Sequence, residues 1–310
     1  MSSETIDRDG IDRRGFLRCM SWAGTAVVWT VAGGVPRSGL ISDARAETSG
    51  LVFAQISDSH IGFNKPANPD VTATLQEAIK RVGAAEEKPR FMIHTGDITH
   101  LSKPAEFDTA AQTIGGANLT THYVPGEHDV LEDEGKSFLN RYGKGTKGAG
   151  WYSFDEAGVH FVGLVNVVDL KGGGMGNLGH EQLEWLEKDL KGRSASTPIV
   201  VFAHIPLWLV YADWGWGTQD GQQALTYLKR FGSVTVLNGH IHQIMQKVEG
   251  HVAFHTALST AFPQPAPGTA PSPGPKAVPP GELRSVLGTT QVSLVQGNRP
   301  LAIVDRPLAG

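Results

Sequence analysis

The chain has 310 residues, and its 40% hydrophobic and 19% charged side chains are typical of a folded globular protein rather than a disordered one. The formal net charge of −4 argues against a nucleic-acid polymer or an anionic membrane as the partner of the whole chain. A single cysteine, Cys19, excludes a disulfide scaffold, a zinc finger and a cysteine protease. Twelve histidines, by contrast, carry most of the functional information.

Residues 1–46 resemble a twin-arginine export signal rather than part of a fold. The pair Arg13-Arg14 precedes a moderately apolar run over 20–35, and Ala44-Arg45-Ala46 supplies a small-residue cleavage site. We therefore expect a signal peptide over 1–46, export by the twin-arginine machinery to the periplasm or beyond, and no stable membrane anchor. An N-terminal anchor with a chance Arg-Arg pair is the alternative.

From residue 51 onward, short apolar runs alternate with segments of helical periodicity. In chain order, the pattern predicts a strand at 51–57, a helix at 71–85, a strand at 90–94, a helix at 104–114, a strand at 121–124, a helix at 131–142, strands at 151–154 and 159–165, a helix at 179–190, a strand at 199–203, a helix at 222–230 and a strand at 234–237.

Strands dominate the end of the chain. They are expected at 246–249, 252–255, 291–295 and 301–304, the last two around the turn Gly297-Asn298. Eight prolines in 263–281 predict an irregular surface excursion. This order predicts an α/β fold, a four-layer αββα sandwich of two mixed β-sheets flanked by helices. We expect one domain over 47–310, with a motif core at 51–260 and a C-terminal strand pair at 290–305.

Polar motifs follow five of the predicted strands. They are Asp58-Ser59-His60, Gly96-Asp97, Gly126-Glu127-His128-Asp129, His204 and Gly239-His240-Ile241-His242. Open α/β sheets gather their binding residues at the carboxyl ends of the strands, so these five loops are expected to converge. So many carboxylates and imidazoles in one place call for metal ions as counter-charge. A mixed oxygen and nitrogen set suits Zn, Mn or Fe.

In this order the motifs resemble those of the calcineurin-like metallophosphoesterases: D-x-H, G-D, G-N-H-D/E, a lone H and G-H-x-H. The resemblance covers about 51–260 and is closest to the single-domain bacterial branch that includes cyclic-nucleotide phosphodiesterases. It implies two metal ions, divalent or mixed-valence (Fe, Mn or Zn). By this resemblance one ion is held by Asp58, His60 and His242, the other by His204 and His240, and Asp97 bridges them.

The chemistry that this resemblance implies is hydrolysis of a phosphoester. Two cations about 3.5–4 Å apart lower the pKa of a shared water, and the resulting hydroxide attacks phosphorus in line. His128 matches the catalytic histidine of the family and would protonate the leaving alkoxide as general acid. Asp129 either orients the His128 ring or caps the helix expected after it.

Glu127 stands where the family pattern has asparagine. A ligating carboxylate would lower the charge of the two-metal site from roughly +2 to about +1, which weakens water activation or favours a trivalent ion. We expect Glu127 to bind the second metal, because an unpaired buried carboxylate is costly. The alternative is that Glu127 turns away and leaves the second site weak.

Three further residues are candidates for contact with the substrate. His100 is expected to touch substrate or metal, with an ordinary loop histidine as the alternative. Trp214 and Trp216 belong to an aromatic stretch after His204, which forms either a wall beside the metals or a loop that packs on itself. The histidines inside predicted strands are expected to be structural.

These observations predict an exported metal-dependent phosphoesterase acting on a small phosphoester. A phosphodiester is the favoured substrate by resemblance. The alternatives are a periplasmic phosphomonoesterase and, because of Glu127, a metal-binding protein with little catalysis.

Overall fold

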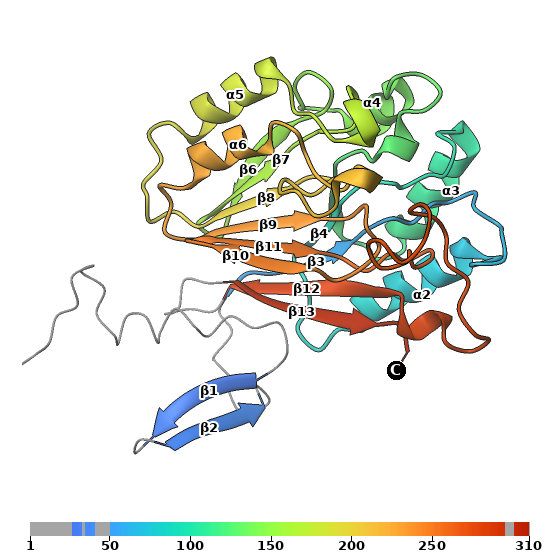
Figure 1. Cartoon of the computed structure of the whole chain (residues 1–310), viewed down its shortest axis with the longest axis horizontal. Helices are drawn as coiled ribbons and strands as arrows, with labels where there is room; N and C mark the ends of the chain where they lie inside the picture. The colour runs from blue at the N-terminus through green and yellow to red at the C-terminus, as the bar shows by residue number, and fades with distance from the viewer. Residues whose placement is uncertain (1–26, 33–34, 41–49, 295–300, 310) are drawn as a thin grey trace, which may run out of the picture. The chain divides into compact units, whose positions relative to one another are not determined.

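The computed structural model describes residues 27–32, 35–40, 50–294 and 301–309 (Figure 1). The chain divides into two units, Met1–Ser49 and Gly50–Gly310. In the first unit, β1 (Val27–Ala32) pairs antiparallel with β2 (Val35–Leu40). The rest of the expected signal peptide and the turn Gly297-Asn298 lie outside the described residues, so both stay predictions.

The second unit is built on two mixed sheets. The smaller sheet has the order β13-β12-β3-β4-β5, in which β3, β4 and β5 are parallel and β12 and β13 antiparallel. The larger has the order β10-β11-β9-β8-β7-β6, with a parallel centre and antiparallel outer strands. The strands are β3 (Val52–Ile56), β4 (Phe91–His94), β5 (Thr120–Tyr123), β6 (Tyr152–Glu156), β7 (Val159–Gly163), β8 (Ile199–Phe202), β9 (Val234–Asn238), β10 (Gln246–Glu249), β11 (Val252–Thr256), β12 (Gly288–Leu294) and β13 (Leu301–Pro307).

Helices cover the outer face of each sheet (Figure 1). They are α2 (Val71–Gly83), α3 (Pro104–Gly115), α4 (Lys136–Tyr142), α5 (His180–Leu190) and α6 (Gly221–Leu228). α2 and α3 pack on the smaller sheet, and α5 and α6 on the larger. Across the described ranges, no helix combines the length and apolar character needed to cross a bilayer.

The period-two alternation of each strand sorts side chains between these layers. In β4, Met92 packs under the helices, whereas Phe91 and Ile93 face the second sheet. In β8, Val201 lies under α5 and α6, whereas Phe202 lies between the sheets. The unit is therefore the four-layer sandwich expected from the sequence.

Helix α4 differs from the prediction, because it begins at Lys136 rather than at residue 131. Glu134 and Gly135 have φ values of 57° and 85°, which interrupt a right-handed helix. The carboxylate of Asp133 accepts hydrogen bonds from the backbone N–H and the hydroxyl of Ser137, at 2.8 and 2.6 Å. Asp133 therefore caps the first turn of α4, and residues 131–135 do not form the additional helical turn that the sequence predicted.

Candidate metal centre

The motif loops leave the parallel strands of both sheets and bond to one another. The N–H of Asp58, after β3, donates to the carbonyl of Gly96, after β4, at 3.0 Å. The N–H of Gly239, after β9, donates to the carbonyl of His204, after β8, also at 3.0 Å. These bonds bring the loops together at the carboxyl ends of the strands, where the sequence placed them.

Five of the expected metal ligands have left-handed backbone conformations. The φ values are 54° for Asp58, 41° for His60, 53° for Asp97, 72° for His240 and 52° for His242. Such a conformation costs a residue with a Cβ on the order of 1–3 kcal/mol, and it is characteristic of functional sites. The loops are therefore shaped to present these side chains rather than to minimise backbone strain.

The first cluster contains Asp58, His60 and His242, all almost fully buried. Nδ1 of His242 donates to the carbonyl of Phe262 at 2.5 Å, which leaves a lone pair on Nε2 of the neutral ring. That nitrogen lies 3.3 Å from Oδ1 of Asp58 and 3.2 Å from Nε2 of His60. Lone pairs that face one another in a buried site fit a bound cation.

The second cluster contains Glu127, His204 and His240. Nδ1 of His204 donates to the carbonyl of Thr95 at 2.7 Å, so its Nε2 again offers a lone pair. Oε2 of Glu127 lies 2.8 Å from that Nε2, and Oε1 lies 3.0 Å from Nδ1 of His240. The Glu127 carboxylate is thus turned toward both histidines, and this donor set also fits a cation.

Asp97 lies between the two clusters. Its Oδ2 is 3.4 Å from Nε2 of His60 and 3.5 Å from Nε2 of His204. Its Oδ1 accepts a hydrogen bond from the backbone N–H of His128 at 2.9 Å. One oxygen of Asp97 is therefore placed to serve both clusters while the other fixes the carboxylate in that orientation.

Two motif glycines allow the loops to approach the carboxylates this closely. A Cβ on Gly126 would lie 2.0 Å from Oδ1 of Asp97, and one on Gly239 would lie 2.6 Å from Oδ2 of Asp58. Any larger residue would displace the expected ligands. Positions 126 and 239 therefore require glycine because a Cβ atom would collide with an expected metal ligand.

The electrostatics of the second cluster are dominated by its carboxylates. Burial lowers the pKa of the His204 ring, but the charges of Asp97 and Glu127 outweigh burial and raise that pKa well above its usual value. For Asp58, burial opposes ionisation, yet the neighbouring His242 brings its pKa down to about 2. Binding of a cation at Nε2 of His204 is therefore expected to release a proton from this ring.

Metal affinity should consequently rise with pH. A cation has to displace the His204 proton, so at any pH below the raised pKa each added pH unit should strengthen binding by up to about tenfold. We expect this slope across pH 6–8 in titrations of the chelator-treated protein with Zn²⁺ or Mn²⁺. An affinity that is flat over this range would contradict the assignment of His204.

His128 lies at the edge of the clusters. Its Nδ1 donates to the backbone carbonyl of His100 at 2.6 Å, which leaves Nε2 available to a substrate. Burial lowers the pKa of His128, whereas Asp97, Glu127 and the bond to His100 raise it, and the result lies above the usual value. These neighbours favour the protonated ring that a general acid requires.

Asp129 forms neither of the expected hydrogen bonds, although its charge contributes to the raised pKa of His128 as expected. Its hydrogen bonds within the described structure go to the backbone N–H groups of Ile98, Thr99 and Gly126 and to the Thr99 hydroxyl, at 2.8–3.0 Å. It therefore neither orients the His128 ring by a hydrogen bond nor caps α4. Fully buried, it ties the loop after β4 to the loop after β5.

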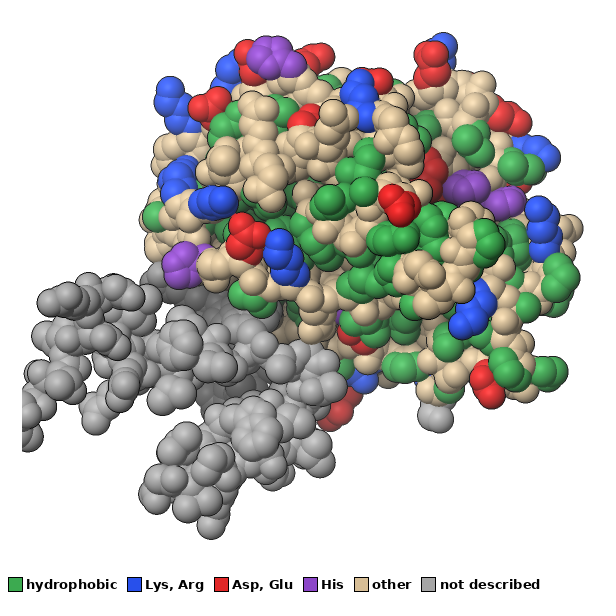
Figure 2. All heavy atoms as spheres, in the orientation of Figure 1, with side chains coloured by type: hydrophobic (Ala, Val, Ile, Leu, Met, Phe, Trp, Pro, Cys, Tyr) green, Lys and Arg blue, Asp and Glu red, His purple; other side chains and the backbone are tan. Residues whose placement is uncertain are grey.

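The clusters open into a pocket of about 220 Å³. In Figure 2, hydrophobic side chains gather near the middle of the visible face, with histidines to their right. Among the described residues, Trp216 lines the pocket and Trp214 does not, because Trp214 packs edge-on against Trp216. The full lining is His60, Phe63, Lys65, Asp97, His100, Glu127, His128, Trp216, His240, Phe262, Gln264, Pro273, Gly274 and Pro275.

Sequence reasoning missed half of this lining, namely Phe63, Lys65, Phe262, Gln264, Pro273, Gly274 and Pro275. The proline-rich segment was expected to be a surface excursion, yet Pro273, Gly274 and Pro275 form one wall. Lys65, an exposed cation after the first motif, lies at another part of the lining. The available signal was the run of prolines after β11, because such a run stiffens a segment without assigning it to a sheet.

The sequence model described as calcineurin-like phosphoesterase matches residues 51–244, which contain every motif above. The chain belongs to this family. It is accordingly a metallophosphoesterase, a hydrolase of phosphoric esters.

Relatives of this phosphoesterase act on different esters. A probable glycerophosphodiester phosphodiesterase of Arcobacter nitrofigilis is 25% identical over 213 residues, which is 63% of this chain and 72% of that protein. A serine/threonine-protein phosphatase of Danio rerio is 26% identical over 237 residues, covering 66% and 74%. The crystal structure of a dimetal phosphatase from Danio rerio matches with a TM-score of 0.61 at 15% identity, over 82% of this chain and 98% of that one, and supports the fold.

Two substitutions of Glu127 distinguish the effect of its charge from the effect of its binding to the metal. If Glu127 binds the second metal, Glu127→Asn should lower affinity for a trivalent ion, while activity with Mn²⁺ or Zn²⁺ holds or rises. Glu127→Ala should instead weaken or empty that site, because it removes a side chain that contacts both His204 and His240. Elemental analysis after gel filtration measures the stoichiometry. Two variants with the metal content, metal preference and rate of the parent would show that Glu127 is not a ligand.

Proposed function

We propose that this phosphoesterase is an exported dinuclear phosphodiesterase that hydrolyses a small phosphodiester. The observation that carries the proposal is the arrangement of two nitrogen and oxygen clusters that share Oδ2 of Asp97, beside a proton donor in one pocket. Asp58, His60 and His242 would hold one ion, and Glu127, His204 and His240 the other. When bound, two such ions lower the pKa of water and neutralise charge that develops on the phosphoryl group.

The residues of the chain supply orientation and a proton. Asp97 keeps its shared oxygen between the clusters, because its other oxygen is fixed by the N–H of His128. The His100 carbonyl holds Nδ1 of His128, so the proton on Nε2 is the one that can pass to the leaving alkoxide. The wall at 273–275 and the side chain of Trp216 limit the space for water around that oxygen.

Charge and size favour a small diester. With Glu127 as a ligand, the charge on a site with two divalent ions falls from about +2 to about +1, and this decrease costs a singly charged diester less attraction than a doubly charged monoester. A pocket of about 220 Å³ is below the ~300–1,000 Å³ of sites for drug-sized ligands, which favours a small alcohol over a polymer. The glycerophosphodiester phosphodiesterase among the relatives is consistent with this class.

The direct test compares bis-p-nitrophenyl phosphate with p-nitrophenyl phosphate after chelation and reloading with Mn²⁺, Zn²⁺ or Fe. We expect the diester to have the higher kcat/KM and the chelated protein to be inactive. A preference for the monoester would favour a phosphomonoesterase. Hydrolysis of neither ester by protein that binds two metals would favour a metal-binding protein with little catalysis.

Export rests on the twin-arginine pattern alone. Replacement of Arg13 and Arg14 together by lysine should keep the full chain in the cytoplasmic fraction of a host that has this export system, whereas the parent should be found outside the cytoplasm. Equal distribution of parent and double variant would overturn export by this route.

A further inference from the structure

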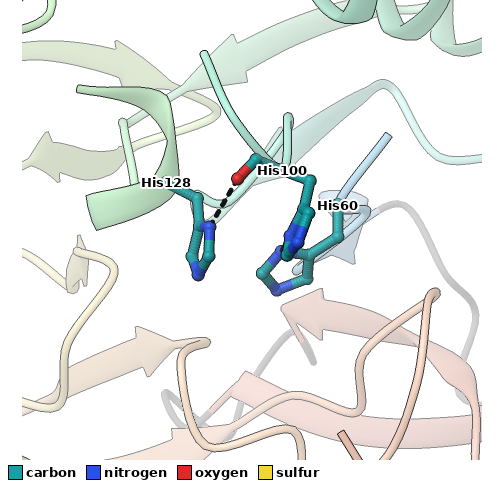
Figure 3. Close-up of side chains that lie close together, drawn as sticks. All are labelled: His60, His100 and His128. Carbon is teal, nitrogen blue, oxygen red and sulfur yellow. Dashed lines mark hydrogen bonds between the residues drawn. The ribbon is translucent and has the colours of Figure 1, made fainter. Parts of the chain in front are cut away.

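Three histidines, one from each of the loops after β3, β4 and β5, lie side by side on one flank of the pocket (Figure 3). The rings of His100 and His128 are nearly parallel, with centroids 4.9 Å apart, and the rings of His100 and His60 meet edge to face at 5.5 Å. The functions proposed above use the ring of His60 and the ring of His128. They leave the side chain of His100 without a role.

The contacts of His60 show which of its nitrogens faces the metal cluster. Its Nε2 lies 3.2 Å from Nε2 of His242 and 3.4 Å from Oδ2 of Asp97, so Nε2 is the nitrogen presented to a cation. A histidine that binds through Nε2 carries its proton on Nδ1 and needs an acceptor there. Nδ1 of His60 faces Nδ1 of His100 at 3.4 Å, and a neutral His100 ring with its proton on Nε2 offers a lone pair at that point.

The backbone of His100 is held independently of its ring. The N–H of His100 donates to the carbonyl of Ile61 at 2.9 Å, and the neighbouring Thr99 forms a parallel bridge with Ile61. Its carbonyl accepts the Nδ1 proton of His128, which Figure 3 draws as a dashed line. The main chain of His100 can therefore hold His128 while its side chain contacts His60.

We propose that His100 is a positioning residue that connects the first metal cluster to the proton donor. Its side chain accepts the Nδ1 proton of His60 and fixes the tautomer and orientation of that ligand, and its carbonyl does the same for His128. One residue thus sets the relative placement of a metal ligand and the general acid. This inference rests on the metal centre proposed above.

The test uses two substitutions that leave the backbone in place. His100→Leu removes the acceptor, whereas His100→Asn puts an amide oxygen as many bonds from the backbone as Nδ1 of histidine. We expect His100→Leu to weaken one of the two bound metals by roughly 10–100-fold, the usual effect of losing a partner of a ligating histidine. His100→Asn should recover most of that affinity, and the other metal should bind as in the parent.

The measurement is competition between the full-length protein and a chelator, with Zn²⁺ as the probe. His180→Leu is the matched control, because it removes an exposed imidazole on α5. In ¹⁵N-histidine spectra of the Zn²⁺-loaded protein, the Nδ1 proton of His60 should be protected from solvent exchange in the parent and in His100→Asn, and lose protection in His100→Leu. A side chain that only fills space would not give this recovery by asparagine.

Two results would overturn the proposal. Parent-like metal affinity in His100→Leu would show that His60 needs no partner at Nδ1. Loss of a third equivalent of metal, with the first two unchanged, would make His100 a ligand in its own right. This test measures metal affinity. Failure of the proposed function would give a different result, a metal-loaded parent without phosphodiesterase activity, so the two outcomes can be distinguished.

Discussion

Asp97→Asn is expected to abolish most hydrolysis and to release at least one metal ion. Oδ2 of Asp97 is the oxygen that lies within 3.5 Å of a ring nitrogen from each cluster, so its charge would be shared by both ions. Loss of that charge removes attraction from both sites at once. A loss of about 4 kcal/mol in transition-state stabilisation corresponds to a rate decrease of roughly 10³-fold.

The substitution is conservative enough to separate chemistry from folding. An asparagine oxygen can still accept the His128 N–H bond that Oδ1 accepts in the parent. The thermal unfolding of the metal-free variant should therefore stay close to that of the metal-free parent. Metal content by elemental analysis and kcat/KM for bis-p-nitrophenyl phosphate are the measurements. A variant with two metals and parental turnover would exclude the dinuclear arrangement.

His128→Ala should keep both metals and slow turnover by roughly 10²–10⁴-fold, the usual scale of general acid catalysis. The backbone N–H of residue 128, which bonds to Asp97, is unaffected by loss of the ring. The metal centre should therefore survive the substitution. The loss should be large for a diester with an alkoxide leaving group and small for p-nitrophenolate, which hardly needs a proton.

The pH profile gives a second readout for His128. A general acid is active when protonated, and the pKa of His128 lies above its usual value of 6.5, with Asp97 and Glu127 opposing the effect of burial. The rate for alkyl esters should fall as pH rises through the pKa that this ring has in the metal-loaded enzyme, and this alkaline limb should disappear in His128→Ala. An equal loss for alkyl and aryl esters, with the limb retained, would assign the proton transfer to another group.

Much of the architecture could be predicted because it is specified by patterns among residues that are close in the sequence. The short apolar run of β4, which is buried on both faces, and the Leu183, Leu186 and Leu190 spacing of α5, which buries one face, both identify their elements from neighbouring residues alone. The expected metal ligands follow the strands directly in the chain. Since parallel strands end at a common edge, a motif after each of them predicts a shared site without knowledge of distances.

The start of α4 shows where local patterns fail. The sequence from residue 131 on has helical character, yet the left-handed backbone at Glu134 and Gly135 and the cap by Asp133 delay the helix to Lys136. Helical periodicity predicts that a helix exists more reliably than it predicts at which residue the helix begins. The beginning of a helix depends on one or two side-chain bonds that periodicity does not describe.

By itself the sequence determined the order of helices and strands, the identity of the candidate metal ligands and the presence of Glu127 where the family pattern has asparagine. The tertiary structure alone decided that Asp129 binds the loop after β4, that the ring of His100 faces His60, and that Pro273–Pro275 walls the pocket. The physical reason is the distance along the chain between the partners. A strand is specified by neighbours two residues apart, whereas these contacts join segments 30 or more residues apart. The hydrogen bonds of Asp129 and His100 form only after β3, β4 and β5 lie side by side in their sheet.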